Sequence, residues 1–174
     1  MPRMTILAIT LLVSLPAATT QASGEQNVLN SPETNWTLRI QKDEFTGRVE
    51  ASAKVINANG DVLGMMCNGR DGSFLSIQFL PKRFLGSQNN AVLVKFDLAE
   101  PLSGTDWEYT SQGAYTLSNS FLVAFTASAS SAEQRILVRA FNYEDQPVDA
   151  EFLSFNAKEA LRRVISACDP TPAS

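Results

Sequence analysis

The chain has 174 residues, 44% of them hydrophobic, and this size and composition predict a single globular domain with a real core. Its formal net charge of −4 argues against a nucleic-acid partner, because such partners are bound by clustered basic residues. The absence of histidine excludes Ser-His-Asp and Cys-His catalysis and any zinc site with His ligands.

The N-terminus has the features of a targeting segment. Arg3 supplies a positive charge, Ile6–Leu15 is apolar, and Pro16–Ala22 is rich in small residues, so residues 1–22 are predicted to be a cleaved signal peptide. The apolar stretch is shorter than the roughly 20 residues that a spanning helix needs. We therefore expect a periplasmic or secreted protein with no integral membrane segment after cleavage. Residues 23–35 are polar and without periodicity, which predicts a flexible leader.

Alternating residues predict a β-rich domain over residues 36–168. The first strand opens at Trp36, and Arg48–Val55 places one face in the core and the other in water. Asn59-Gly60 predicts a hairpin turn into Val62–Cys67. Ser73–Leu80 then completes a predicted antiparallel meander.

The next segments are predicted as a strand at Ala91–Leu98, a turn at Glu100–Gly104, and short paired strands at Asp106–Thr110 and Ala114–Leu117. Ser118–Ser131 is ambiguous. Phe121–Phe125 is apolar enough for a buried strand, but Ser118 and the alanines beyond favour a helix, which is our prediction.

The C-terminal part is predicted to contain two strands and a helix. The strands are Gln134–Phe141 and Ala150–Phe155, separated by a turn at Glu144–Pro147. The helix is Asn156–Cys168, and Asp169-Pro170 stops it before a loose tail at residues 169–174.

The terminal helix has an apolar stripe and a predicted capping box, with Asn156 as N-cap and Glu159 as its acid. The stripe recurs at helical spacing and consists of Ala157, Ala160, Leu161, Val164, Ile165 and Cys168. The predicted fold class is therefore α+β, with an antiparallel sheet or sandwich-like barrel closed by the C-terminal helix.

The chain has two cysteines, Cys67 and Cys168. In an exported protein a lone pair favours a structural disulfide over a metal or redox site. The predicted bridge fastens the terminal helix to a strand end, and the alternative is two buried free thiols.

Surface recognition is the chemistry that the sequence leaves open. Trp107 and Tyr109 lie two apart on one predicted strand, so they share a face. Charged side chains are predicted to point outward from other strands. The candidate binding surface is Lys95, Asp97, Trp107, Tyr109 and Arg139. In the alternative interpretation, Trp107 and Tyr109 cover the core.

Other site chemistry has little support in the sequence. Paired catalytic carboxylates, as in a glycosidase, would have to come from the acids between Asp97 and Glu108, which are predicted at strand ends and turns. There is no calcium-loop or phosphate-binding motif, so no cofactor or metal is expected.

Several short motifs resemble the small periplasmic proteins associated with type VI secretion and related exported bacterial proteins. The motifs are Trp36, Met65–Cys67, Val94–Asp97, Trp107, Ile136–Arg139, Phe152–Phe155 and Ala160–Cys168. The resemblance implies a β-rich fold closed by a cysteine-anchored helix and an accessory role in the envelope.

The expected function is therefore non-catalytic: binding of another envelope protein or a cell-wall ligand. Two alternatives remain. The first is a secreted inhibitor or immunity protein that blocks an enzyme such as a lysozyme through the acidic connection between Asp97 and Glu108. The second is a hydrolase that uses carboxylates.

Overall fold

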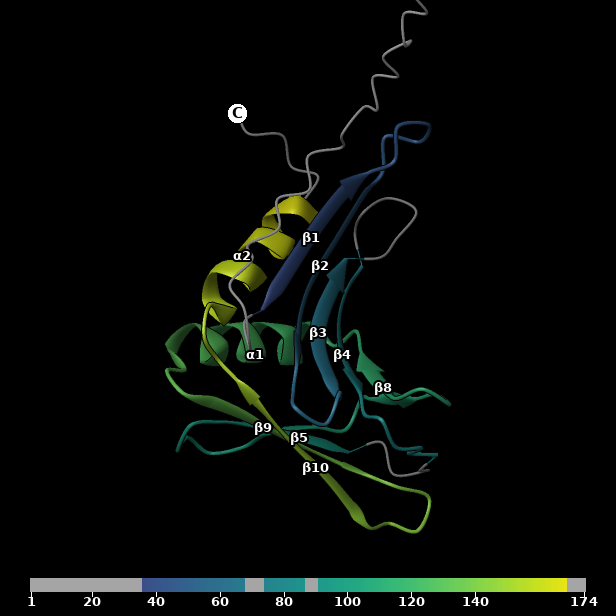
Figure 1. Cartoon of the computed structure of the whole chain (residues 1–174), viewed down its shortest axis with the longest axis vertical. Coiled ribbons are helices and arrows are strands. Elements are labelled where there is room, and N and C mark those ends of the chain that lie inside the picture. The colour runs from purple at the N-terminus through teal and green to yellow at the C-terminus, as the bar shows by residue number, and fades with distance from the viewer. Residues whose placement is uncertain (1–35, 68–73, 87–90, 169–174) are drawn as a thin grey trace, which may run out of the picture.

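The computed structural model describes three stretches of the chain, residues 36–67, 74–86 and 91–168 (Figure 1). The predicted signal peptide at 1–22, the leader at 23–35 and the tail at 169–174 lie outside the described residues.

Antiparallel strands form two sheets. The larger sheet has the order β1 (Thr37–Lys42), β2 (Val49–Ile56), β3 (Val62–Cys67), β4 (Leu75–Leu80), β8 (Ala114–Thr116), β7 (Glu108–Tyr109). The smaller sheet has the order β10 (Pro147–Leu153), β9 (Arg135–Phe141), β5 (Val92–Phe96), β6 (Leu102–Gly104). The helices are α1 (Asn119–Ser131) and α2 (Ala157–Cys168). Figure 1 shows α2 beside β1 and the strands of the smaller sheet crossing below the larger one.

The predicted meander is confirmed in β2, β3 and β4, which pair in succession. Ala51, Ala53 and Val55 of β2 are buried, while Glu50 and Lys54 are exposed. This is the alternation that a half-buried strand requires, and it fixes the register because a shift by one residue would expose the apolar set.

The two sheets meet through large side chains. Phe79 of β4 contacts Phe152 of β10 edge to face, with ring centroids 6.2 Å apart. The indole of Trp36 donates a 3.3 Å hydrogen bond to the backbone oxygen of Leu153, at the edge strand β10. This bond satisfies an edge carbonyl and links the start of β1 to the smaller sheet.

The ambiguous segment is a helix, as predicted. α1 buries Phe121, Leu122, Phe125 and Ala129. Phe125 contacts Phe96 edge to face at 5.2 Å, so this apolar run lines the core with one face of a helix.

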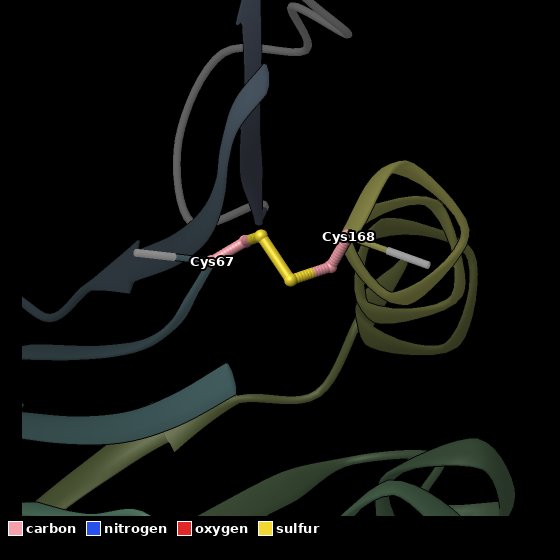
Figure 2. Close-up of a disulfide and its surroundings, with 2 residues drawn as sticks. All are labelled: Cys67 and Cys168. Atoms are coloured by element: carbon pink, nitrogen blue, oxygen red, sulfur yellow. A yellow bond between two sulfur atoms is a disulfide. The ribbon is translucent and has the colours of Figure 1, made fainter. Parts of the chain in front are cut away.

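The terminal helix α2 packs against β1, β2, β3 and α1, and its buried stripe includes Leu161 and Val164. Cys168 in its last turn forms a disulfide with Cys67 at the end of β3, with Cα atoms 5.7 Å apart (Figure 2). The predicted bridge is confirmed, and it closes 101 positions of chain.

The predicted α+β class with antiparallel strands is confirmed. The barrel form of that prediction is not shown, because the described strands form two open sheets whose strand orders do not return to their first members. One prediction about the sheets needs correction. The predicted turn at Glu100–Gly104 contains strand β6, which pairs with β5. Pro101 and Gly104 resemble turn residues, but Gly104 has a packing role: a Cβ there would lie 2.5 Å from the Trp107 indole nitrogen.

The predicted capping box of α2 is also wrong. Asn156 has φ 62° and occupies the left-handed position of a turn that the Ala157 N–H closes on the Ser154 oxygen. An N-cap residue is normally extended, so Asn156 serves here for its tolerance of positive φ. Glu159 is bound by the Arg162 guanidinium at 2.8 Å and does not reach back to residue 156.

Candidate functional site: the outer groove of the smaller sheet

The candidate site is a groove of about 460 Å³ on the solvent-facing side of the smaller sheet. We call it the outer groove. Its lining comes from β5, β9, β10 and two turns: Asn59, Leu93, Lys95, Pro101, Leu137, Val138, Arg139, Asp149, Ala150 and Glu151. A volume of this size is within the range of small-ligand pockets and suits a few side chains of a partner.

Strand register brings the groove residues together. Arg139 in β9 lies between Leu93 in β5 and Asp149 in β10. One pair further on, Leu137 lies between Lys95 and Glu151. The alternate residues Val94, Val138 and Ala150 are buried. The outward face of the sheet therefore carries two rows across the strands, each with a leucine and charged side chains.

One charge pair in the groove is already complete. The Arg139 guanidinium donates two hydrogen bonds of 2.6 Å to the Asp149 carboxylate. The hydrogen bonds from Arg139 hold the pKa of Asp149 below its usual value, and the Asp149 carboxylate raises the pKa of Arg139. Both side chains are about half exposed, at 49% and 56%. The pair orders the groove and leaves little charge for a ligand.

Lys95 is different, because no described carboxylate forms an ion pair with it. Glu151 is near Arg135 instead, at 3.8 Å. The groove therefore presents one uncompensated ammonium group beside the apolar surface of Leu93 and Leu137. This combination suits a partner that carries a carboxylate next to an apolar side chain.

Of the five residues predicted as a binding surface, Lys95 and Arg139 line the groove, and Asp97 does not. Asp97 follows β5 with φ 47°, and its carboxylate accepts backbone hydrogen bonds from residues 133, 134 and 135 at 2.8, 3.0 and 2.8 Å. These bonds lower its pKa, and they fasten the start of β9. The role of Asp97 is structural.

Trp107 and Tyr109 lie inward, as the alternative interpretation proposed. Trp107 is 1% exposed and contacts Phe121 edge to face at 5.4 Å. The half-buried Tyr109 hydroxyl donates to the Ala91 oxygen at 3.0 Å and accepts from the Phe141 N–H at 3.4 Å. Burial raises the pKa of Tyr109. Neither ring forms the surface patch.

Asp149 and Glu151 line the groove but were not among the predicted binding residues. They alternate with Val148, Ala150 and Phe152, so the period of two places both acids on the outer face. That signal was readable, but the pairing of β9 with β10 and β5 was needed to place them beside Arg139 and Leu137.

Two of the acids considered for catalysis, Asp97 and Glu108, are engaged in other contacts. Asp97 has its carboxylate occupied by backbone N–H groups and a lowered pKa, whereas a general acid needs a raised one. Glu108 accepts a hydrogen bond from Tyr115 across β7 and β8. Within the described ranges there is no group of three or more metal-ligating side chains.

Comparison with protein-family models, with curated proteins and with solved structures gave no match for this chain. Among the helices in the described part of the chain, none is long and apolar enough to cross a membrane.

Proposed function

We propose that the protein is an exported, non-catalytic binding module of the bacterial envelope that holds a protein partner in the outer groove. The observation that carries the proposal is the placement of the unpaired Lys95 ammonium beside Leu93 and Leu137. We infer that the partner inserts an acidic segment with apolar neighbours, because a carboxylate would complete the charge on Lys95 and apolar side chains would cover the leucines.

Two further features support the proposed location and the proposed role in the bacterial envelope. The Cys67–Cys168 disulfide fits an oxidising compartment, so a periplasmic or secreted location is proposed. The short motifs resembling type VI secretion-associated proteins favour an accessory role in the envelope. A cell-wall ligand is a weaker candidate for this groove, because the leucines at the centre of the groove are apolar and Lys95, which has no ion-pair partner among the residues that the structure describes, is positive.

The test is site-specific photocrosslinking in cells that export the protein. A photoreactive amino acid at position 137 is expected to give a crosslinked partner, and the same residue at Thr37, exposed on β1 of the other sheet, is the matched control. Lys95→Glu should abolish the position-137 product because it replaces the attraction with repulsion. Lys54→Glu, an exposed lysine on β2, should leave that product unchanged. Equal products at positions 137 and 37, or no effect of Lys95→Glu, would contradict the proposal.

An inhibitor of a lysozyme-like enzyme is the second candidate. It is favoured by the turn after β5, where Leu98 is 88% exposed and Glu100 is also exposed. Such a turn could enter a basic cleft with an apolar wall. The check is lysozyme activity with the purified protein and with a Leu98→Ala, Glu100→Gln variant. Inhibition by the native chain alone would support this candidate, and no inhibition by either would exclude it for the enzyme tested.

A further inference from the structure

A second cavity, of about 480 Å³, lies at the N-terminal end of α2, apart from the outer groove. We call it the α2 cavity. It is lined by the end of α1, the segment that follows it, the connection between β10 and α2, and the first two turns of α2: Ala129, Ser130, Ala132, Glu133, Ser154, Phe155, Asn156, Ala157, Lys158, Glu159 and Arg162. The proposed partner in the outer groove does not use this cavity, and the two linings share no residue.

The first turn of α2 leaves backbone donors unsatisfied. The Ala157 N–H donates to the Ser154 oxygen and the Ala160 N–H to the Asn156 oxygen, but the N–H groups of Lys158 and Glu159 have no acceptor among the described residues. The side chain that the sequence predicted as a cap is not in place. A helix N-terminus carries a partial positive charge, so these two donors favour an anionic oxygen.

An independent observation also indicates a missing partner. Ser154 is 3% exposed and lines the α2 cavity, and its hydroxyl has no hydrogen-bond partner within residues 36–67, 74–86 and 91–168. Buried hydroxyl groups nearly always have one. A ligand oxygen in the cavity would give the Ser154 hydroxyl an acceptor.

The other lining residues indicate which groups a ligand would carry beside its anionic oxygen. Phe155 is 60% exposed, and with Ala132 and Ala157 it forms an apolar wall. Lys158 forms no ion pair with a described residue, whereas Arg162 is held by Glu159 at 2.8 Å. Glu133 places one opposing carboxylate on the rim.

We propose that the α2 cavity binds the C-terminal carboxylate of a peptide whose last residue is apolar. The carboxylate lies at the first turn of α2 and accepts hydrogen bonds from the N–H groups there and from Ser154. The apolar side chain lies against Phe155 and Ala132. The proposal concerns a different face from the outer groove and does not depend on it.

The experiment is an amide NMR titration of ¹⁵N-labelled protein with N-acetyl-L-leucine, a mimic of a peptide C-terminus. We expect saturable shifts of the Lys158 and Glu159 amides, with a Kd on the order of millimolar for so small a ligand. N-acetyl-L-leucinamide, which lacks the charge, and sodium chloride at equal ionic strength should not produce them. Acetate, which lacks the apolar group, should bind more weakly.

Variants sharpen the result. Ser154→Ala should weaken binding roughly three- to tenfold, the effect of one hydrogen bond, and Glu133→Gln should strengthen it by removing a like charge. Glu144→Gln, an exposed acid in the turn after β9, is the control and should change nothing. Thermal unfolding of each variant checks that it folds. Absence of saturable shifts, equal shifts with the amide, equal affinity for acetate, or unchanged affinity in Ser154→Ala would each overturn the proposal.

Discussion

The hydroxyl of Tyr109 in the larger sheet donates a hydrogen bond of 3.0 Å to the backbone oxygen of Ala91, next to the first residue of β5 in the smaller sheet. The same hydroxyl accepts from the N–H of Phe141 in β9 at 3.4 Å. Tyr109 thus bridges two neighbouring strands of the smaller sheet from outside it. It ties the two sheets together near one end of the β5–β9 pair.

Removing this hydroxyl should destabilise the fold. Tyr109→Phe keeps the ring but removes the hydroxyl that bonds the Ala91 oxygen and the Phe141 N–H, both half-buried. We therefore expect a loss of about 1 kcal/mol in the free energy of unfolding. Urea unfolding of the purified chain measures it. The control is Tyr143→Phe, whose side chain is 64% exposed and has no described hydrogen bond. Equal stability of the two variants would show that the bridge contributes nothing.

Tyr109 also marks the limit of what the sequence predicts. Local alternation identified β2 with its buried Ala51, Ala53 and Val55, because that signal is contained within eight residues. The partners of Tyr109 lie 18 and 32 positions away, and they are backbone atoms that any residue carries. The sequence therefore left the Trp107 and Tyr109 pair undecided between core and surface.

The disulfide should contribute substantially to stability. Cys67→Ala with Cys168→Ala is expected to lose ~2–4 kcal/mol, because the bridge restricts a long loop in the unfolded chain. Reduction of the native protein should lower its melting temperature toward that of the double variant, which should not respond to reductant. If fully reduced native protein, verified by thiol titration, melts at the original temperature, the bridge does not stabilise the fold.

The apolar face of α2 should be as sensitive as a central core position. Leu161 is 0% exposed, so Leu161→Ala should cost about 2–5 kcal/mol through lost burial and the cavity left behind. Ser166→Ala, on the exposed face of the same helix, should change the free energy of unfolding by less than about 0.5 kcal/mol. Similar values for the two variants in urea unfolding would mean that α2 is not packed on the sheet.

Only part of the outer groove could be predicted from the sequence, because local patterns do not show which strands pair. Outward positions such as Lys95 and Arg139 follow from strand periodicity, so the sequence identified them. Whether Asp149 and Glu151 lie near them depends on which strands pair, and the ion pair of Arg139 with Asp149 exists only through the β9–β10 register. Asp97 shared the same outward pattern, but a left-handed backbone after β5 directs it to the start of β9.

Asp97 gives a prediction about pH. Hydrogen bonds from three backbone N–H groups lower its folded-state pKa below the ordinary 3.8, so its ionised form is favoured by folding. The resulting stability is fully present above the unfolded pKa and is lost as the pH falls through the folded pKa. At pH 7 Asp97→Asn should melt at a lower temperature than the native chain. The difference should begin to shrink as the pH falls toward 3.8, where the carboxyl of the unfolded chain binds its proton, and it should be smallest once the pH lies below the lower folded-state pKa.

The matched control for Asp97 is Asp145→Asn. Asp145 also has positive φ, at 57°, but has no described side-chain hydrogen bond, so its replacement should not alter the pH profile. Asp97→Ala should melt lower than Asp97→Asn, because alanine neither accepts the hydrogen bonds nor tolerates the left-handed backbone. Thermal unfolding of all four proteins between pH 7 and pH 2.5 tests this. A difference between native chain and Asp97→Asn that stays constant across that range would show that the charge on Asp97 does not fasten β9, because only an ionisation-dependent contribution disappears with protonation.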